Sequence, residues 1–324
     1  MPTVAKVTRL SVIVPCYQVG PYVRQTLTSL VRNAAPGIEV VLVDDASTDA
    51  TPMILAEHAD RLGPLTKIIR HPVNAGLAAA RNTGLRAATG EHITFLDGDD
   101  WLGPGHLADL LGAVERLGCD LVRTDHVQVT GRARQVRRVP YGPRGQVGSP
   151  RSGILPAHRM TSVDHPYAWA GIYHRRLLDA GLLAFDEQLR TCEDRPWAWR
   201  LHLRATSFAV VGLTGLFYRR AVTSSLSQVT DERQLDFLPA FDLVVDEVAR
   251  DADAERLMPK VLRSYLAIMH HHLDRRPLYE RALGDELVRR SRDALARLPR
   301  SDLGVALADL DPDRRQRLNR LVAA

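Results

Sequence analysis

The sequence predicts an α/β fold, with a mainly parallel sheet flanked by helices and a helical C-terminal domain. In the first third of the chain, apolar runs of strand length alternate with helical patterns. These runs are continuous rather than alternating in polarity, which is typical of strands buried on both faces of a sheet. From residue 231 onward, nearly all of the sequence has the apolar spacing of amphipathic helices. We therefore expect two domains, residues 1–230 and 231–324.

The predicted strands and helices follow one another in a regular order. Strands are expected at residues 10–17, 38–47, 65–72 and 92–100, and helices at residues 21–34, 51–63 and 76–89. Parallel strands joined by helices bring their carboxyl ends to one edge of the sheet, and ligands bind at that edge. The side chains that follow each strand are therefore the candidates for function.

The second third of the chain is more irregular. Residues 131–151 are rich in Gly, Pro and Arg and contain no acidic residue, so we expect a loop. It is either a solvated excursion or a mobile basic flap that meets an anionic substrate. Residues 165–220 then predict a helix, a loop, a second helix and a strand.

Composition narrows the class of protein. The 324 residues are 45% hydrophobic, yet every apolar run is shorter than the roughly 18–20 residues of a membrane-spanning helix. We expect no export signal, and three distant cysteines without a CxxC pair favour a reducing cytoplasm. The net charge of +5 comes largely from arginine and suits phosphate-rich ligands or an anionic membrane surface. No Lys/Arg run is dense enough to predict nucleic-acid binding.

Three carboxylates follow the fourth predicted strand in the stretch "FLDGDD". Asp97 and Asp99 suit a hard divalent cation, Mn²⁺ or Mg²⁺, because oxygen ligands can share such an ion with a diphosphate. Asp100 is either a third polar contact or the turn that ends the strand. Each aspartate alone could also be an ordinary cap or turn residue.

Polar residues follow the other strands as well. Asp45 lies at the sheet edge next to Tyr17, where a carboxylate can accept a base N–H while an aromatic ring stacks on the base. Residues 47–49 are expected to be a capping turn. Arg81, in the Ala-rich helix, either extends to solvent or holds a diphosphate through its fork of N–H groups.

Four stretches, taken together, resemble a known family. "SVIVPCYQVGPYVRQTLTSLV", "EVVLVDDASTDAT", "NAGLAAARNTGLRAATGEHITFLDGDDW" and "TCEDRPWAWRL" are similar, in this order, to the signatures of family 2 glycosyltransferases. These are inverting enzymes with the Rossmann-like GT-A fold, and the resemblance covers residues 9–228. It implies a nucleotide-sugar donor, with UDP favoured over GDP and dTDP, a Mn²⁺ or Mg²⁺ ion, and transfer with inversion at the anomeric carbon.

The resemblance also implies roles for individual residues. The nucleotide-sugar contacts would be Pro15, Tyr17 and Asp45 at the base, Arg81 near the diphosphate, Asp97 on the ribose and sugar side, and Arg219 or Arg220 with Ser224 or Ser225 over the phosphates. Asp99 would coordinate the metal together with Asp97. In the acidic pair Glu193-Asp194, Asp194 would be the catalytic base, and the same pair can cap the helix that follows. Trp169 would contact a sugar.

The implied partners are a UDP-sugar and a glycan, polyol-phosphate or lipid-linked acceptor. We expect a cytoplasmic protein that can associate with the inner face of the membrane, with the helical tail as a surface for self-association. Two alternatives stay open at this stage. One is a catalytically silent nucleotide-sugar-binding or scaffold protein. The other is a Mg²⁺-dependent aspartyl-phosphate phosphohydrolase, against which Trp101 argues, since that position would be Thr or Val.

Overall fold

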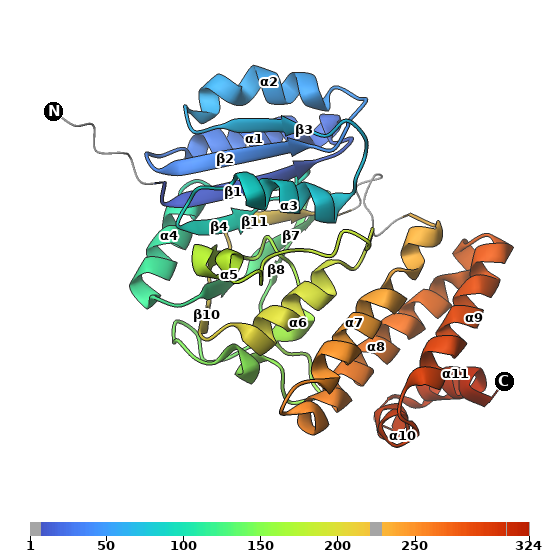
Figure 1. Cartoon of the computed structure of the whole chain (residues 1–324). Helices are drawn as coiled ribbons and strands as arrows, with labels where there is room; N and C mark the ends of the chain where they lie inside the picture. The colour runs from blue at the N-terminus through green and yellow to red at the C-terminus, as the bar shows by residue number, and fades with distance from the viewer. Residues whose placement is uncertain (1–7, 221–228, 309, 324) are drawn as a thin grey trace.

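The computed structural model describes residues 8–220, 229–308 and 310–323. It consists of a seven-stranded sheet flanked by helices, a smaller four-stranded sheet, and a group of C-terminal helices packed beside them (Figure 1).

The main sheet is mixed rather than purely parallel. Its strand order is β10-β6-β9-β4-β1-β2-β3, with β1 (Leu10–Cys16), β2 (Ile38–Asp44), β3 (Lys67–Arg70), β4 (His92–Phe95), β6 (Leu121–Thr124), β9 (Gly171–His174) and β10 (Phe208–Val211). The first four strands are parallel, as predicted, and β9 runs antiparallel between β4 and β6. The strand order reverses after β3, so right-handed crossovers place helices on both faces. In Figure 1, α3 (Leu77–Ala87) lies in front of the sheet and α1 (Gly20–Asn33) behind it.

Helices α1, α2 (Thr51–Leu62) and α3 match their predicted positions closely. The other helices of this part are α4 (His106–Leu117), which was not predicted, α5 (Arg175–Asp179) and α6 (Asp194–Arg204), with short 3₁₀ turns at Pro150–Gly153 and Ser162–Asp164. The predicted order of helix, loop, helix and strand after residue 165 is confirmed by α5, α6 and β10. Strand β9, which precedes α5, was not predicted, because four residues are too short to show a period.

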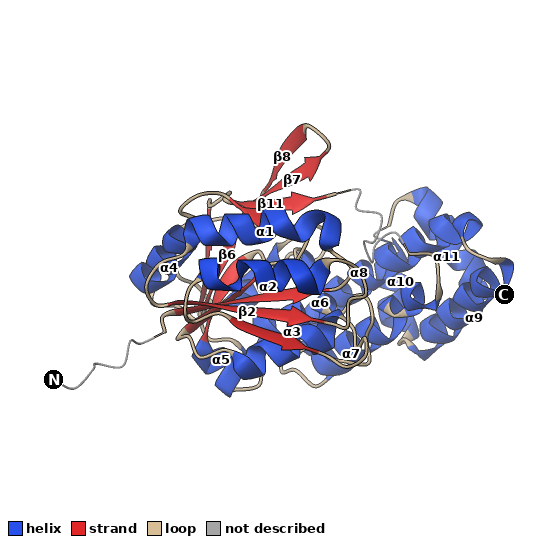
Figure 2. Ribbon diagram, turned by 90° about the horizontal axis from the view of Figure 1, so that it is seen from above, coloured by secondary structure: helices blue, strands red, loops and turns tan. Residues whose placement is uncertain are grey.

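The expected loop at residues 131–151 is wrong in its first part. Residues Ala133–Arg137 form strand β8, which pairs antiparallel with β7 (His126–Thr130) across a two-residue turn. Gly131 supplies the positive φ of +57° in this turn. The hairpin belongs to the smaller sheet, of order β5-β11-β7-β8, with β5 (Trp101–Leu102) and β11 (Leu216–Arg219), and it projects from the body of the molecule (Figure 2).

The C-terminal part is helical, as predicted. After a 3₁₀ turn at Glu232–Leu235 come α7 (Phe237–Ala249), α8 (Ala254–Arg275), a second turn at Arg276–Leu278, α9 (Arg281–Arg297), α10 (Arg300–Ala308) and α11 (Pro312–Ala323). No helix in the described ranges is long and apolar enough to cross a membrane. The helices share a core of their own, which also includes Ile154, Val163, Trp199 and Leu203 from earlier in the chain.

Helix α6 therefore borders two cores. Trp197 is buried in the core of the main sheet, and Trp199, two residues later and on the other side of the helix, is buried in the core of the C-terminal helices. Both tryptophans are packing residues, and neither is available as a stacking platform for a sugar. The predicted domain boundary near residue 230 remains a prediction, since α6 packs both against the main sheet and against the helices that follow residue 230.

Helix α3 packs so closely on β1 that Gly84 has no room for a side chain. We expect Gly84→Ala to destabilise the protein by about 1–3 kcal/mol, because its Cβ would overlap Ile13, a buried side chain in the middle of the sheet. The matched control is Gly112→Ala in α4, which meets no atom within 4 Å. This second change should be neutral or stabilise by about 0.4–1 kcal/mol, as alanine restricts the unfolded chain. Urea unfolding of the two variants would show the contrast, and equal effects would contradict the packing argument.

Candidate active site

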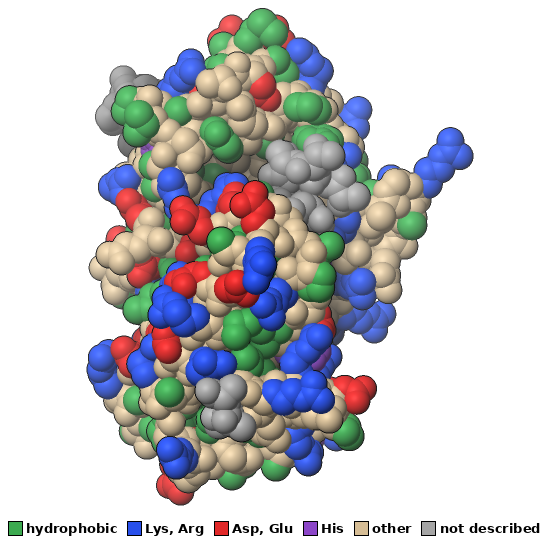
Figure 3. Space-filling view, turned by 90° about the vertical axis from the view of Figure 1, so that its right-hand side faces the viewer, with side chains coloured by type: hydrophobic (Ala, Val, Ile, Leu, Met, Phe, Trp, Pro, Cys, Tyr) green, Lys and Arg blue, Asp and Glu red, His purple; other side chains and the backbone are tan. Residues whose placement is uncertain are grey.

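A cavity of about 1050 Å³ opens at the carboxyl ends of the central strands and extends to the C-terminal helices. Most of the predicted site residues line it: Pro15, Tyr17, Asp45, Arg81, Asp97, Asp99, Glu193 and Asp194. Trp169 lines it as well. Figure 3 views this side of the molecule, where acidic and basic side chains lie together across the middle of the face. The sheet edge thus gathers residues that are up to 179 positions apart in the sequence, from Pro15 to Asp194.

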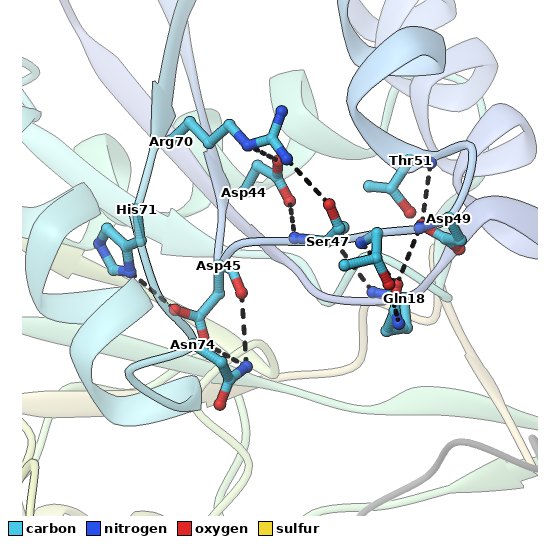
Figure 4. Close-up of polar contacts among 10 residues, drawn as sticks. Gln18, Asp44, Asp45, Ser47, Asp49, Thr51, Arg70, His71 and Asn74 are labelled. Carbon is cyan, nitrogen blue, oxygen red and sulfur yellow. Dashed lines mark hydrogen bonds and ion pairs between the residues drawn. The ribbon is translucent and has the colours of Figure 1, made fainter.

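The carboxylate of Asp45 organises the loop that leads into α3 (Figure 4). One oxygen accepts hydrogen bonds from Ala75 N at 2.8 Å and is 2.7 Å from His71 Nδ1. The other accepts from Gly76 N at 2.8 Å and Asn74 Nδ2 at 2.9 Å. Asp45 is buried, so these donors compensate the loss of water around its charge. Each oxygen of Asp45 thus already accepts two hydrogen bonds, and an N–H group of a nucleobase would have to be an additional donor to one of them.

The turn after β2 holds the neighbouring part of the cavity wall in place. Asp49 accepts from Thr51 N at 3.0 Å and from Gly20 N at 2.8 Å, and Gln18 Oε1 accepts from Thr48 N and Asp49 N. The turn predicted at residues 47–49 is present as an Asx turn of Asp49 with Thr51 N, while Ala50, the N-cap of α2, has no side-chain cap. This turn links the end of β1 to the start of α2, and Tyr17 lies between them with 47% of its side chain exposed.

Arg81 is buried and joins two acidic segments. Its Nη1 donates to Glu193 Oε1 at 2.7 Å and its Nη2 donates to Asp97 Oδ1 at 3.0 Å. The guanidinium also lies over the Phe185 ring, 5.2 Å from its centroid. Burial alone would lower the pKa of Arg81, but the carboxylates of Asp97 and Glu193 raise it overall. The alternative in which Arg81 extends to solvent is wrong, because only 4% of its side chain is exposed.

The acidic pair at the start of α6 has two different environments. Glu193 is buried against Arg81, and burial together with the Asp194 charge raises its pKa to about 7, despite the opposing effect of Arg81. Asp194 is the first residue of α6 and keeps 24% of its side chain exposed to the cavity. Burial raises its pKa too, against the opposing charges of Arg195 and Arg81. Asp194 is thus the member of the pair that can reach a ligand, and Glu193 positions Arg81.

Gly98 allows the acidic end of β4 to lie directly against β1. A Cβ at this position would be 3.1 Å from the carbonyl oxygen of Pro15 and 3.2 Å from Cys16 Sγ, so the glycine serves close packing of the two strand ends. Asp100, whose role was open, is fully buried and accepts a hydrogen bond from Arg219 N at 2.7 Å. It joins the two sheets and does not line the cavity.

Neither Arg219 nor Arg220, the predicted phosphate contacts at the end of β11, lines the cavity. Arg219 donates from Nε to the Asp99 carbonyl oxygen at 2.8 Å, and its guanidinium stacks over Trp101 at 4.6 Å from the ring centroid. It faces α1 and does not line the cavity. Arg220, one residue later, points to the other side of the strand and donates to the Tyr218 hydroxyl at 3.1 Å. Ser224 and Ser225 lie outside the described residues.

The acidic strand end fits a divalent cation with incomplete protein coordination. Burial and the neighbouring charge of Asp97 raise the pKa of Asp99 to about 6, against the opposing effects of its own backbone N–H and of Arg219. A carboxylate whose charged form is disfavoured on balance favours a nearby cation. Asp97 already accepts from Arg81, and the described residues contain no group of three potential His, Cys, Asp or Glu ligands. An ion held by Asp99 and Asp97 would take its other ligands from a substrate and from water.

An aromatic wall that the sequence did not reveal lies beside Asp194. Tyr167 and Trp169 are stacked with centroids 4.7 Å apart, and Tyr218 is 5.0 Å from Trp169. All three line the cavity, as does Arg195. Only Trp169 was predicted as a contact. Tyr167 and Tyr218 are separated by 51 residues, so no local pattern could have paired them.

Comparisons with known proteins agree with this geometry. The family model for "Glycosyl transferase family 2" matches residues 11–176. The chain is 29% identical over 227 residues to the uncharacterized glycosyltransferase EpsJ of Bacillus subtilis, covering 70% of this chain and 65% of EpsJ. It is 26% identical over 294 residues to the poly(ribitol-phosphate) beta-N-acetylglucosaminyltransferase TarS of Staphylococcus aureus, covering 86% of this chain but only 49% of TarS.

The solved structures of TarS have the same fold. A crystal structure of TarS in complex with UDP-GlcNAc matches with a TM-score of 0.74 at 21% identity, over 97% of this chain and 87% of that one. The predicted GT-A fold with its helical C-terminal part is therefore confirmed. Since the family model covers about half of the sequence and includes β1 to β4 with their acidic ends, the chain belongs to glycosyl transferase family 2.

Proposed function

We propose that this chain transfers a sugar from a nucleotide-diphosphate donor to a hydroxyl acceptor, with inversion at the anomeric carbon. The observation that carries the proposal is the position of Arg81. It bonds to Asp97 at the acidic strand end and to Glu193 beside Asp194, so the acidic strand end and a partly exposed carboxylate are held together by one buried cation. Inverting transfer needs these two functions on opposite sides of one sugar.

Asp194 is the proposed general base. An acceptor hydroxyl is a weak nucleophile, and a carboxylate that takes its proton makes it attack the anomeric carbon. As the new C–O bond forms, the bond between that carbon and the donor phosphate breaks, and the nucleoside diphosphate leaves with the electron pair. The raised pKa of Asp194 makes it a stronger base than an ordinary aspartate.

The other side of this site would receive the leaving group. Tyr17 and Asp45, which line the cavity, would bind the nucleobase, and Asp97 and Asp99 would hold a Mn²⁺ or Mg²⁺ ion against the diphosphate. Such an ion would supply charge stabilisation on the diphosphate oxygens. Arg81 keeps the two carboxylates of its ion pairs in place, because a buried guanidinium with two charged partners has little freedom to move.

The comparisons support a particular nucleotide-sugar donor and suggest which classes of acceptor to consider. The TarS structures contain UDP or UDP-GlcNAc, which supports a UDP-sugar for this chain. The acceptor would be a glycan, polyol-phosphate or lipid-linked molecule, in line with the names of TarS and of the succinoglycan biosynthesis protein ExoO. We place the enzyme in the cytoplasm, at or near the inner face of the membrane, with the C-terminal helices as a surface for self-association.

A thermal-shift screen of nucleotide sugars, with and without Mn²⁺, tests the proposal directly. A ligand that binds only the folded state increases the free energy of unfolding, by about 2.7 kcal/mol at a ligand concentration of 100 times its Kd. The melting temperature rises as a result. We expect a response to UDP-sugars that depends on the metal. If no nucleotide sugar raised the melting temperature under either condition, the proposed function would be wrong.

Asp194→Asn should separate binding from catalysis. We expect turnover of the matched donor to fall by about 10²–10⁴-fold, because the amide cannot take the proton, while the shift produced by the UDP-sugar is kept. In the unmodified protein, activity should fall as the pH drops through the pKa of Asp194, since the base must be deprotonated. The midpoint of this fall in activity should lie at a pH above the ordinary aspartate pKa of about 3.9. Asp109→Asn, on the exposed face of α4, is the control. Unchanged turnover in Asp194→Asn would favour the catalytically silent alternative.

Asp99→Asn should stabilise the metal-free protein while removing its response to metal. The folded pKa of about 6 exceeds the unfolded value of about 3.9, so the unmodified protein loses stability as the pH rises through this window. The variant should be more stable by an amount on the order of 1–3 kcal/mol above pH 6, and the difference should vanish below pH 4. Urea unfolding over this pH range would measure it.

The control for this charge effect is Asp49→Asn. Burial works against the Asp49 charge, but hydrogen bonds from Thr51 and Gly20 outweigh it and lower its pKa, so this change should destabilise the protein at neutral pH. Addition of Mn²⁺ and UDP should raise the melting temperature of the unmodified protein and leave that of Asp99→Asn unchanged. A metal response in Asp99→Asn would show that the ion binds elsewhere.

A further inference from the structure

The smaller sheet presents one of its two faces to the aromatic wall of the cavity. Gln128 of β7 pairs with Tyr218 of β11, and His126 of β7 pairs with Arg137 of β8. Side chains of directly paired residues share a face, and alternate residues of a strand share it too. Tyr218, Arg220, His126 and Arg137 are therefore on one face, while Arg219 and Arg134 are on the other.

Ring contacts connect this face to the proposed base. His126 packs edge-on against Trp169 at 4.9 Å and Tyr167 at 5.4 Å. Arg137 is paired with His126 and so lies on the neighbouring strand, β8, on the same face of the sheet. Tyr167 lies near Asp194: burial raises the pKa of the Tyr167 hydroxyl and the Asp194 charge raises it further, whereas Arg195, Arg220 and Arg137 lower it. Arg220 and Arg137 therefore lie on the face of the smaller sheet that carries Tyr218, and Arg195 lines the cavity together with Tyr167 and Asp194.

Arg220 and Arg137 have no carboxylate partner in the part of the chain that the structure describes. Arg220 donates to the Tyr218 hydroxyl, and Arg137 donates from Nε to Gln128 Oε1 at 3.1 Å, so their partners are neutral. Arg195 approaches a carboxylate only at 4.0 Å, to Asp194 Oδ1. Arg81, by contrast, has both of its charged partners within 3.0 Å.

Arginines without a full carboxylate partner attract an anion, and their N–H forks match the oxygens of a phosphate. Resting on the function proposed above, we infer that the acceptor carries a phosphate group close to the hydroxyl that receives the sugar, and that Arg195, Arg220 and Arg137 bind this phosphate. It would lie on the acceptor side of Asp194, away from the donor diphosphate at Asp97 and Asp99. Binding there would hold the acceptor hydroxyl against the base.

The test compares phosphorylated and neutral polyols at saturating UDP and Mn²⁺, so that the donor phosphate site is filled. Ribitol 5-phosphate and glycerol 3-phosphate are titrated by calorimetry against ribitol and glycerol. We expect the phosphates to bind at least about tenfold more tightly, the equivalent of one charge-assisted hydrogen bond. Each of Arg195→Gln, Arg220→Gln and Arg137→Gln should remove most of this preference.

Arg134→Gln is the matched control, because it removes the same charge from the same strand on the opposite face. It should retain the preference for phosphate. A second arm uses sedimentation with phosphatidylcholine vesicles that contain phosphatidic acid, to separate a lipid phosphate from a soluble one. Loss of vesicle or polyol-phosphate binding in Arg137→Gln but not in Arg134→Gln supports the inference and identifies the source of the phosphate.

Three outcomes would overturn the inference. One is no preference for phosphate in either arm, and another is an equal loss in Arg134→Gln and Arg137→Gln, which would indicate diffuse charge attraction. The third is a preference that survives all three arginine changes. If UDP with Mn²⁺ failed to raise the melting temperature of the unmodified protein, the proposed function itself would fail, whereas UDP binding without phosphate preference would sink the inference alone.

Discussion

The buried guanidinium of Arg81 is the interaction on which the rest of the site depends. It connects Asp97, at the end of β4, to Glu193, before α6, although 96 residues separate the two carboxylates in the sequence. A charge in this position requires its partners, since removing one member of a buried ion pair typically costs about 3–5 kcal/mol. The acidic strand end and the acidic helix start are therefore tied to the same cation.

The position of Asp194 follows from the helix that carries it. Trp197 packs in the core of the main sheet, where it donates from Nε1 to the Leu183 carbonyl oxygen at 3.0 Å, and Trp199 packs among the C-terminal helices. Two bulky side chains on opposite sides of α6 prevent the helix from rotating. Since Asp194 is its first residue, its carboxylate is aimed at the cavity by packing on both sides, and this gives the C-terminal helices an indirect part in the site.

The two faces of the smaller sheet have different contacts. On one face, Arg219 stacks on Trp101 and Tyr22 and bonds to the Asp99 carbonyl oxygen, so it fixes the backbone of the acidic strand end. On the other face, Tyr218 is part of the aromatic wall, and Arg220 donates to its hydroxyl. Two adjacent arginines that look equivalent in the sequence therefore have different roles, because the period of a strand sends them to opposite sides.

By itself, the sequence determined the architecture and the residues at the carboxyl edge of the sheet, where the nucleotide-sugar donor is proposed to bind. Continuous apolar strands ending in Asp45 and in Asp97-Gly98-Asp99 predicted a parallel sheet with polar residues at its carboxyl edge, because strand periodicity and turn residues are local signals. Only the tertiary structure decided that Glu193 pairs with Arg81, that Asp100 and Arg219 join the two sheets, and that Tyr167, Tyr218 and Arg195 line the cavity with Asp194. These contacts link residues tens to more than a hundred positions apart, and no local period records which strand face or which distant side chain will be the neighbour.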